Sequence, residues 1–166
     1  MNADDLEPIF VAHYARMARL IARIIRDPGR AEELAVEVFL KYSPTTVAAG
    51  MTVEGWLYRT SARMALDELR SRTRRSRYEP LLRLAGKAAT PEEIHTANQE
   101  QSRVRAVLGS MSPRQAELLL LRSEGLRYEE LAAVLELNPA SVGTLLSRAQ
   151  RAFRKEYEER YGTESY

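Results

Sequence analysis

The chain has 166 residues, of which 45% are hydrophobic and 29% charged, a composition typical of globular proteins and unlike that of disordered or fibrous ones. It contains no cysteine, which excludes disulfides, thiolate zinc sites and thiol nucleophiles, and we expect a cytoplasmic protein. The net charge is only +2, no apolar run approaches the roughly 20 residues that span a bilayer, and acids stand near the N-terminus, so we expect neither a membrane segment nor an export signal.

The first half of the sequence predicts three helices. Apolar residues recur every three or four positions over residues 10–25, which predicts a helix with one buried face. Asp27 and Pro28 are an N-cap and a first-turn proline that open a second helix, whose apolar stripe is Ala31, Leu34, Ala35, Val38 and Phe39. A third periodic segment runs over about residues 53–72, with Trp56, Leu57, Thr60, Met64 and Leu69 facing inward.

The second half predicts four more helices after a linker. Residues 76–89 contain Pro80 and Gly86 and have no sustained period, which predicts the linker. A capping box at residues 90–93 and a proline start at Pro113 open the next two helices. A short helix follows over residues 128–135, and Asn138 with Pro139 opens the last one, which ends near residue 161. We therefore expect an all-α fold of two small helical domains, residues 1–75 and 90–166, joined by the linker at 76–89.

The last two predicted helices are separated by residues 136–138 alone, a spacing typical of a helix-turn-helix. The apolar stripe of the final helix would pack on the preceding helix and leave a small, polar face free to enter a major groove. That face carries Ser141, Gly143, Thr144, Ser147, Arg148 and Arg151. The alternative is a pair of capped helices in an ordinary bundle.

Arginines gather where the third predicted helix ends. Five of them lie within eight positions, at Arg70, Arg72, Arg74, Arg75 and Arg77. Their mutual repulsion is relieved by a polyanion, or by water and nearby acids. Trp56, earlier in the same helix, could offer a surface on which unpaired bases stack, or it could fill the core.

Catalytic and metal sites are not predicted. His13 and His95 lie in different predicted domains, and no spacing of His, Asp or Glu matches a metal site or a nucleophile-base pair. The glycines are scattered singly, without a phosphate-binding loop. We expect no enzyme activity, no cofactor, no metal and no small-molecule substrate.

These segments together resemble the extracytoplasmic-function (ECF) sigma factors. Residues 27–34 (DPGRAEEL), 37–40 (EVFL), 56–59 (WLYR) and 66–70 (LDELR) resemble the second conserved region of that family. Residues 111–115 (MSPRQ), 124–126 (EGL), 128–132 (YEELA) and 147–149 (SRA) resemble its fourth region, a helix-turn-helix. The resemblance covers most of the chain outside the linker and tail.

The resemblance implies a factor that binds core RNA polymerase and promoter DNA. It implies polymerase contacts by Glu32, Glu33, Leu34, Glu37, Val38 and Phe39. It implies capture of the melted −10 strand by Trp56, Arg59, Arg63, Arg70, Arg72, Arg74 and Arg75, and reading of the −35 element by the face of the last helix. An anti-sigma protein is a further partner that the resemblance suggests.

The sequence departs from the family pattern at several positions. Val36 stands where glutamine is usual, Tyr42 near a usual tryptophan and Arg63 where asparagine is usual. Arg127 replaces a hydroxyl N-cap and Gly143 a common lysine, each at a cost of about 1 kcal/mol of helix stability. These departures leave two alternatives open: a sigma-like module that binds polymerase or a regulator without opening promoters, and a helix-turn-helix repressor.

Overall fold

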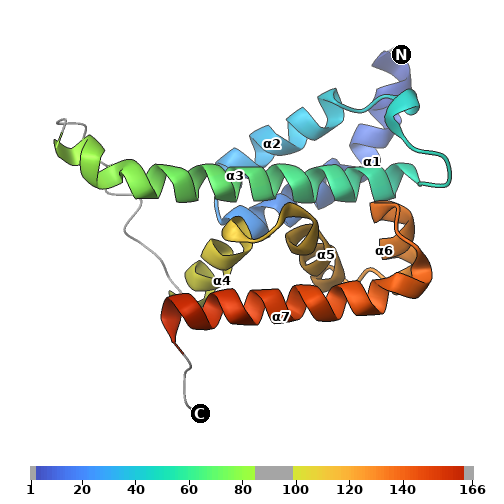
Figure 1. The fold of residues 1–166 in the computed structure, drawn as a ribbon. Coiled ribbons are helices and arrows are strands. Elements are labelled where there is room, and N and C mark those ends of the chain that lie inside the picture. Colours follow the sequence, from blue (N-terminus) through green and yellow to red (C-terminus); the bar gives the residue numbers. More distant parts are fainter. Residues whose placement is uncertain (1–2, 85–98, 163–166) are drawn as a thin grey trace.

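The computed structural model describes residues 3–84 and 99–162 (Figure 1). Within these ranges the chain is helical and has no strand, which confirms the expected all-α class. The helices are α1 (Ala3–Ile25), α2 (Pro28–Leu40), α3 (Val53–Leu84), α4 (Gln99–Ser110), α5 (Pro113–Ser123), α6 (Tyr128–Leu135) and α7 (Val142–Tyr161). No helix in this part of the chain is long and apolar enough to cross a membrane.

Local start and stop signals were reliable for most of these helices. The Oδ1 atom of Asp27 accepts a hydrogen bond from the backbone N–H of Arg30 at 3.0 Å, so the predicted N-cap of α2 is confirmed. The bounds predicted for α6 and the end predicted for α7 are also confirmed. The first helix begins at Ala3, earlier than the periodicity predicts. The capping box at 90–93 lies outside the described residues.

The predicted end of the third helix near residue 72 is wrong. Helix α3 continues through Ser76 and Pro80 to Leu84, so the first part of the predicted linker is helical. Residues 74–79 are mostly arginine and glutamate, which are good helix formers, and the first glycine comes only at residue 86. Pro80 removes one backbone donor from the helix, which loses stability there without ending.

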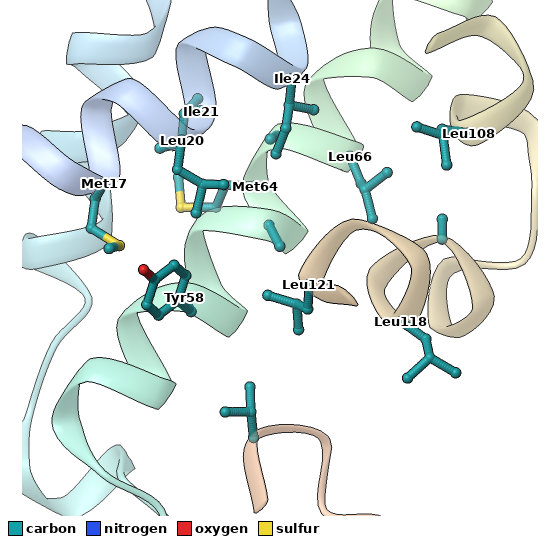
Figure 2. Packing of buried hydrophobic residues seen from close by; sticks show 14 of the residues in the cluster. Met17, Leu20, Ile21, Ile24, Tyr58, Met64, Leu66, Leu108, Leu118 and Leu121 are labelled. Atoms are coloured by element: carbon teal, nitrogen blue, oxygen red, sulfur yellow. The ribbon is translucent and has the colours of Figure 1, made fainter. Parts of the chain in front are cut away.

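Helix α3 is buried on two sides. Figure 1 shows it between the pair formed by α1 and α2 and the group formed by α4, α5, α6 and α7. In Figure 2, Met64 lies toward Leu20 of α1, and Leu66 lies on the side of α3 turned toward Leu121 of α5. The buried side chains of α3 lie between Leu57 and Leu69, and they face both groups of helices. One continuous hydrophobic cluster therefore joins the two halves of the chain through α3.

Two glycines permit close contact between α3 and the second half. A Cβ atom built on Gly55 would lie 2.9 Å from the Cγ2 atom of Val134 in α6, closer than side chains tolerate. On Gly109 of α4 the same atom would lie 3.2 Å from the Oγ1 atom of Thr73. Each glycine lets a helix of the second half approach the α3 backbone more closely than alanine would allow.

Candidate nucleic-acid interface

The turn between α6 and α7 has the predicted position and tight geometry. Glu136 adopts a left-handed conformation at φ 54° and ψ 48°, which reverses the chain at the end of α6. The N–H of Leu137 donates to the carbonyl of Ala132 at 2.8 Å. Asn138 then caps the next turn, because its Oδ1 atom accepts from the N–H of Ala140 at 3.0 Å. The chain enters α7 through the short 3-10 turn Pro139–Ser141.

The two faces of α7 differ as a helix-turn-helix requires. Val142, Leu146 and Ala149 are buried. The opposite face holds the residues predicted to read duplex DNA: Ser141 and Gly143 are half-buried, whereas Thr144, Ser147, Arg148 and Arg151 are exposed. Within residues 3–84 and 99–162 no acid pairs with Arg148 or Arg151. Both guanidinium groups are therefore available to an external anion.

The structure explains how α6 begins without a hydroxyl N-cap at Arg127, but it gives no reason for glycine at position 143. Arg127 provides no side-chain cap, but Glu130 accepts a hydrogen bond from the Arg127 N–H at 2.7 Å, which satisfies that donor and lowers the pKa of Glu130. A Cβ atom on Gly143 would meet the Tyr128 ring at 3.5 Å, an ordinary contact, so packing does not require glycine there. Tyr128 itself, with Arg122 stacked 5.4 Å from its ring centroid, adjoins the start of α7. Sequence analysis missed this aromatic-arginine pair.

Three of the arginines predicted to contact a melted strand are bound to the second half of the chain. Arg59 pairs with Glu136 at 3.2 Å between Nη1 and Oε2. The Arg63 guanidinium pairs with Glu117 of α5, whose side chain is only 7% exposed. Arg70 donates to the backbone carbonyl of Met111 at 3.3 Å. These contacts line a groove of about 470 Å³ between α3 and α5.

The remaining predicted residues of α3 behave differently from one another. Arg72 donates to the carbonyl of Ile25 at 2.9 Å and pairs with Asp27 at 3.0 Å, so it ties α3 to the turn between α1 and α2. Arg74 and Arg75 are exposed, with Arg75 at 3.7 Å from Glu68. The side chain of Arg77 lies outside the described part. Acids inside the protein thus offset part of the repulsion in this cluster.

Trp56 lies between the two alternatives that the sequence left open. Its indole ring is half-buried and packs edge-on against Tyr42, with the ring centroids 5.6 Å apart. Tyr42, the departure from the usual tryptophan, is 6% exposed and supports the indole from the core side. Trp56 therefore contributes to packing while keeping part of its ring in contact with solvent.

The apolar residues assigned to polymerase contact on α2 do not lie on its surface. Leu34, Val38 and Phe39 are 3%, 0% and 2% exposed, so they are buried in this conformation, and their role in polymerase contact stays a prediction. They belong to the buried stripe that packs α2 against α1 and α3. Glu32 and Glu33 are exposed and Glu37 is half-buried.

The surface of α2 instead pairs these acids with two other apolar side chains. Val36 is 41% exposed and Leu40 is 74% exposed. Arg30 holds Glu33 at 2.7 Å and Glu37 at 3.6 Å, which keeps the acidic side chains in a fixed arrangement. We name Glu32, Glu33, Val36, Glu37 and Leu40 the α2 surface. It combines negative charge with exposed apolar area, as protein contact sites do.

The described residues offer no metal-binding cluster. In residues 3–84 and 99–162 no group of three His, Asp or Glu side chains could hold a metal ion. The arrangement instead supplies arginine-rich surfaces on α7 and at the exposed end of α3, suited to contact with an anion.

Comparison with known protein families gives a match in the second half. A sequence model described as Sigma-70, region 4 matches residues 101–152, which run from α4 through the helix-turn-helix into α7.

Comparison with individual proteins extends over most of the chain. The ECF RNA polymerase sigma factor SigK of Mycolicibacterium vanbaalenii is 32% identical over 167 residues, covering 88% of this chain and 80% of SigK. SigE of Mycolicibacterium smegmatis, also named an ECF RNA polymerase sigma factor, is 32% identical over 86% of this chain and 57% of SigE. The RNA polymerase sigma factor CarQ of Myxococcus xanthus is 27% identical over 92% of this chain and 87% of CarQ.

A solved structure shares the fold. The sigma factor RpoE from Bartonella quintana, crystallised with the anti-sigma factor NepR, superposes with a TM-score of 0.50 over 94% of this chain and 98% of RpoE. The two sequences are 18% identical, so this likeness concerns the fold alone.

The pair between Arg63 and Glu117 should show an asymmetric response to substitution. Arg63→Met leaves a carboxylate in a nearly buried site without its partner, and we expect a loss of about 1–2 kcal/mol in the free energy of unfolding. Glu117→Gln leaves a half-exposed guanidinium that water can solvate, and we expect a loss below about 1 kcal/mol. Urea unfolding of both variants and of the double variant measures the difference. An equal or larger loss for Glu117→Gln would contradict this assignment of the pair.

Proposed function

This chain belongs to the ECF family of RNA polymerase sigma factors, and on that premise we propose that it binds core RNA polymerase and directs it to promoters with two recognition elements. Two observations together carry the proposal. The chain has a helix-turn-helix whose second helix, α7, exposes arginines, and its relatives in this family are similar to it across both halves. We propose that residues 1–75 and 90–166 act as its two functional modules.

Recognition of the −35 element is assigned to α7. The small side chains at Ser141, Gly143 and Thr144 allow the start of the helix to approach base edges closely, and Ser147 can donate a hydrogen bond. Arg148 and Arg151 lie further along the same face, where guanidinium groups reach the phosphates. Their lack of acidic partners within the described residues supports this role, because no ion pair must break before DNA binds.

Capture of the −10 strand is assigned to α3, and it requires a rearrangement. Arg59, Arg63 and Arg70 are engaged by the second half in this structure, so they reach DNA only after α5 and α6 move away from α3. We propose that polymerase supplies this separation by holding the two modules apart. Trp56, Arg72, Arg74 and Arg75 complete the −10 surface, with Arg74 and Arg75 already exposed.

Polymerase docking is assigned to the α2 surface. Its acids suit a basic partner, while Val36 and Leu40 provide exposed apolar area above the buried Leu34, Val38 and Phe39. Val36, a departure from the family's glutamine, would strengthen the apolar part of that contact. The buried trio then acts indirectly, by fixing the orientation of α2.

Membership of the ECF family also leads us to propose a regulatory partner and a cellular location for the chain. We propose that an anti-sigma protein regulates the chain, because the structural neighbour RpoE was crystallised with one. We propose that the chain acts in the cytoplasm, where polymerase works, and that it is a specificity factor without catalytic residues, cofactor or metal of its own. We do not propose a decoy or a repressor, because no observation favours either.

Run-off transcription with core polymerase tests the proposal. We expect the purified chain plus core enzyme to give a transcript of defined length from a promoter of its own regulon, and core enzyme alone to give none. Binding to core without a specific transcript would indicate a decoy, and duplex binding that excludes polymerase would indicate a repressor. Either result would contradict the proposed function.

Arg148→Ala should weaken binding to duplex DNA that carries the upstream element. Loss of one phosphate contact should reduce the slope of log Kd against log salt concentration by about 0.9. Fluorescence anisotropy at several salt concentrations measures this slope. Arg114→Ala, which removes an exposed arginine from α5, is the matched control and should leave the slope unchanged. An unaltered slope in Arg148→Ala would rule out the phosphate contact.

A further inference from the structure

Helix α1 and the residue that follows it carry a row of arginines that neither promoter element uses. Arg16, Arg19, Arg23 and Arg26 recur at three- and four-residue spacing, beside the buried face that contains Met17, Leu20, Ile21 and Ile24. All four arginines are exposed. They line an open groove of about 770 Å³, whose other wall includes Tyr58 of α3 and Glu124 at the end of α5.

The groove carries more positive than negative charge. Arg16 pairs with Glu54 and lies 4.9 Å from the centroid of the Tyr58 ring, and Arg23 pairs with Glu124. Among the residues that the structure describes, no acid pairs with Arg19 or Arg26. The whole chain has a net charge of only +2, so two uncompensated guanidinium groups in one groove are a local concentration of charge.

A further arginine, Arg105 on α4, lies near the end of this row. Burial is the main reason that its pKa is lowered, and repulsion from Arg26 and Arg72 adds to the effect. Arg26 is therefore close enough to other cations to repel them, and an anion bound there would relieve the repulsion.

Folding alone does not explain the arginine at position 26. Its backbone is left-handed at φ 56°, and its N–H donates to the carbonyl of Ala22 at 2.8 Å, as in a helix C-cap. Glycine is the usual residue in this conformation, because a Cβ atom costs about 1 kcal/mol there. Interaction of the cation with the helix dipole recovers about 0.3–1 kcal/mol of that cost. Arginine at this position therefore gives the fold no more stability than glycine would.

We propose that the α1 groove binds the phosphodiester backbone of nucleic acid, with Arg19 and Arg26 contacting phosphates. The row from Arg16 to Arg26 is about 15 Å long at a rise of 1.5 Å per residue, and successive Cβ atoms lie about 5–6 Å apart. A repeating series of cations along an open groove suits a repeating anion better than one compact anion. Guanidinium groups also match phosphate oxygens in geometry.

This contact goes beyond the proposed function. It lies on α1, outside the residues assigned to the −35 and −10 elements. A contact to phosphates does not depend on the base sequence. It would add affinity for nucleic acid of any sequence and leave promoter choice to α3 and α7.

The full-length chain with Arg19→Ala and Arg26→Gly tests the inference. Glycine is favoured at the backbone angle of position 26, so the variant should fold, which circular dichroism and thermal unfolding check. The control, Lys41→Ala with Lys155→Ala, removes the same charge from exposed positions after α2 and on α7. Fluorescence anisotropy with a random-sequence single strand, its duplex and polyglutamate as probes, across salt concentrations, measures binding.

We expect the groove variant to lose about 1.4 from the salt slope for the single strand and about 1.8 for the duplex, the values for two phosphate contacts. The control should change each slope by clearly less. An unchanged slope, or an equal change in the control, would overturn the inference. An equal loss of polyglutamate affinity would overturn it in favour of an acidic protein partner. Because these probes contain neither promoter nor polymerase, a failure of the proposed function would leave this result unaffected.

Discussion

The burial of α3 on two sides is the constraint on which the rest of the structure depends. Its apolar residues meet α1 and α2 on one side and the helices of the second half on the other, and small residues such as Ala62 and Ala65, each 0% exposed, allow close packing. Gly55 and Gly109 extend the close approach toward both ends of the interface. The position of every surface discussed above follows from this shared helix.

The same interface controls what α3 can offer to DNA. Arg59 and Arg63 carry charges suited to phosphates, yet they face Glu136 and Glu117 across the junction between the halves. Arg63 replaces the family's usual asparagine, so this departure adds an ion pair to the junction where the family residue would carry no charge. Reading of the −35 element needs no such release, because α7 presents its polar face outward.

Features fixed by neighbouring residues could be predicted from the sequence. The bounds of α6, the turn at Glu136 and the cap at Asn138 depend on signals within a few positions, and they were correct. The stripe of Leu34, Val38 and Phe39 was also correctly predicted as buried by its periodicity. The polymerase contacts that the family resemblance implies for the same residues stay a prediction, because burial in the free chain does not test them.

Features set by distant residues could not be predicted. The acidic partners of Arg63 and Arg23 lie 54 and 101 positions away in the sequence, and no local sequence pattern predicts such ion pairs. Part of the buried surface of α3 consists of Ser61, Ala62 and Ala65, which are too small or too polar to stand out in a search for large apolar residues. The arginine spacing on α1 was visible in the sequence, but the groove beside it depends on where α5 ends.

The most direct test of this account is the distance between the two halves before and after polymerase binds. The chain has no cysteine, so Val11→Cys on α1 and Glu158→Cys on α7 introduce unique, exposed labelling sites. Pulsed electron spin resonance should give one narrow distance distribution for the free chain and a distinctly longer mean distance with core polymerase. An unchanged distance in a complex that transcribes would contradict the release of the α3 arginines.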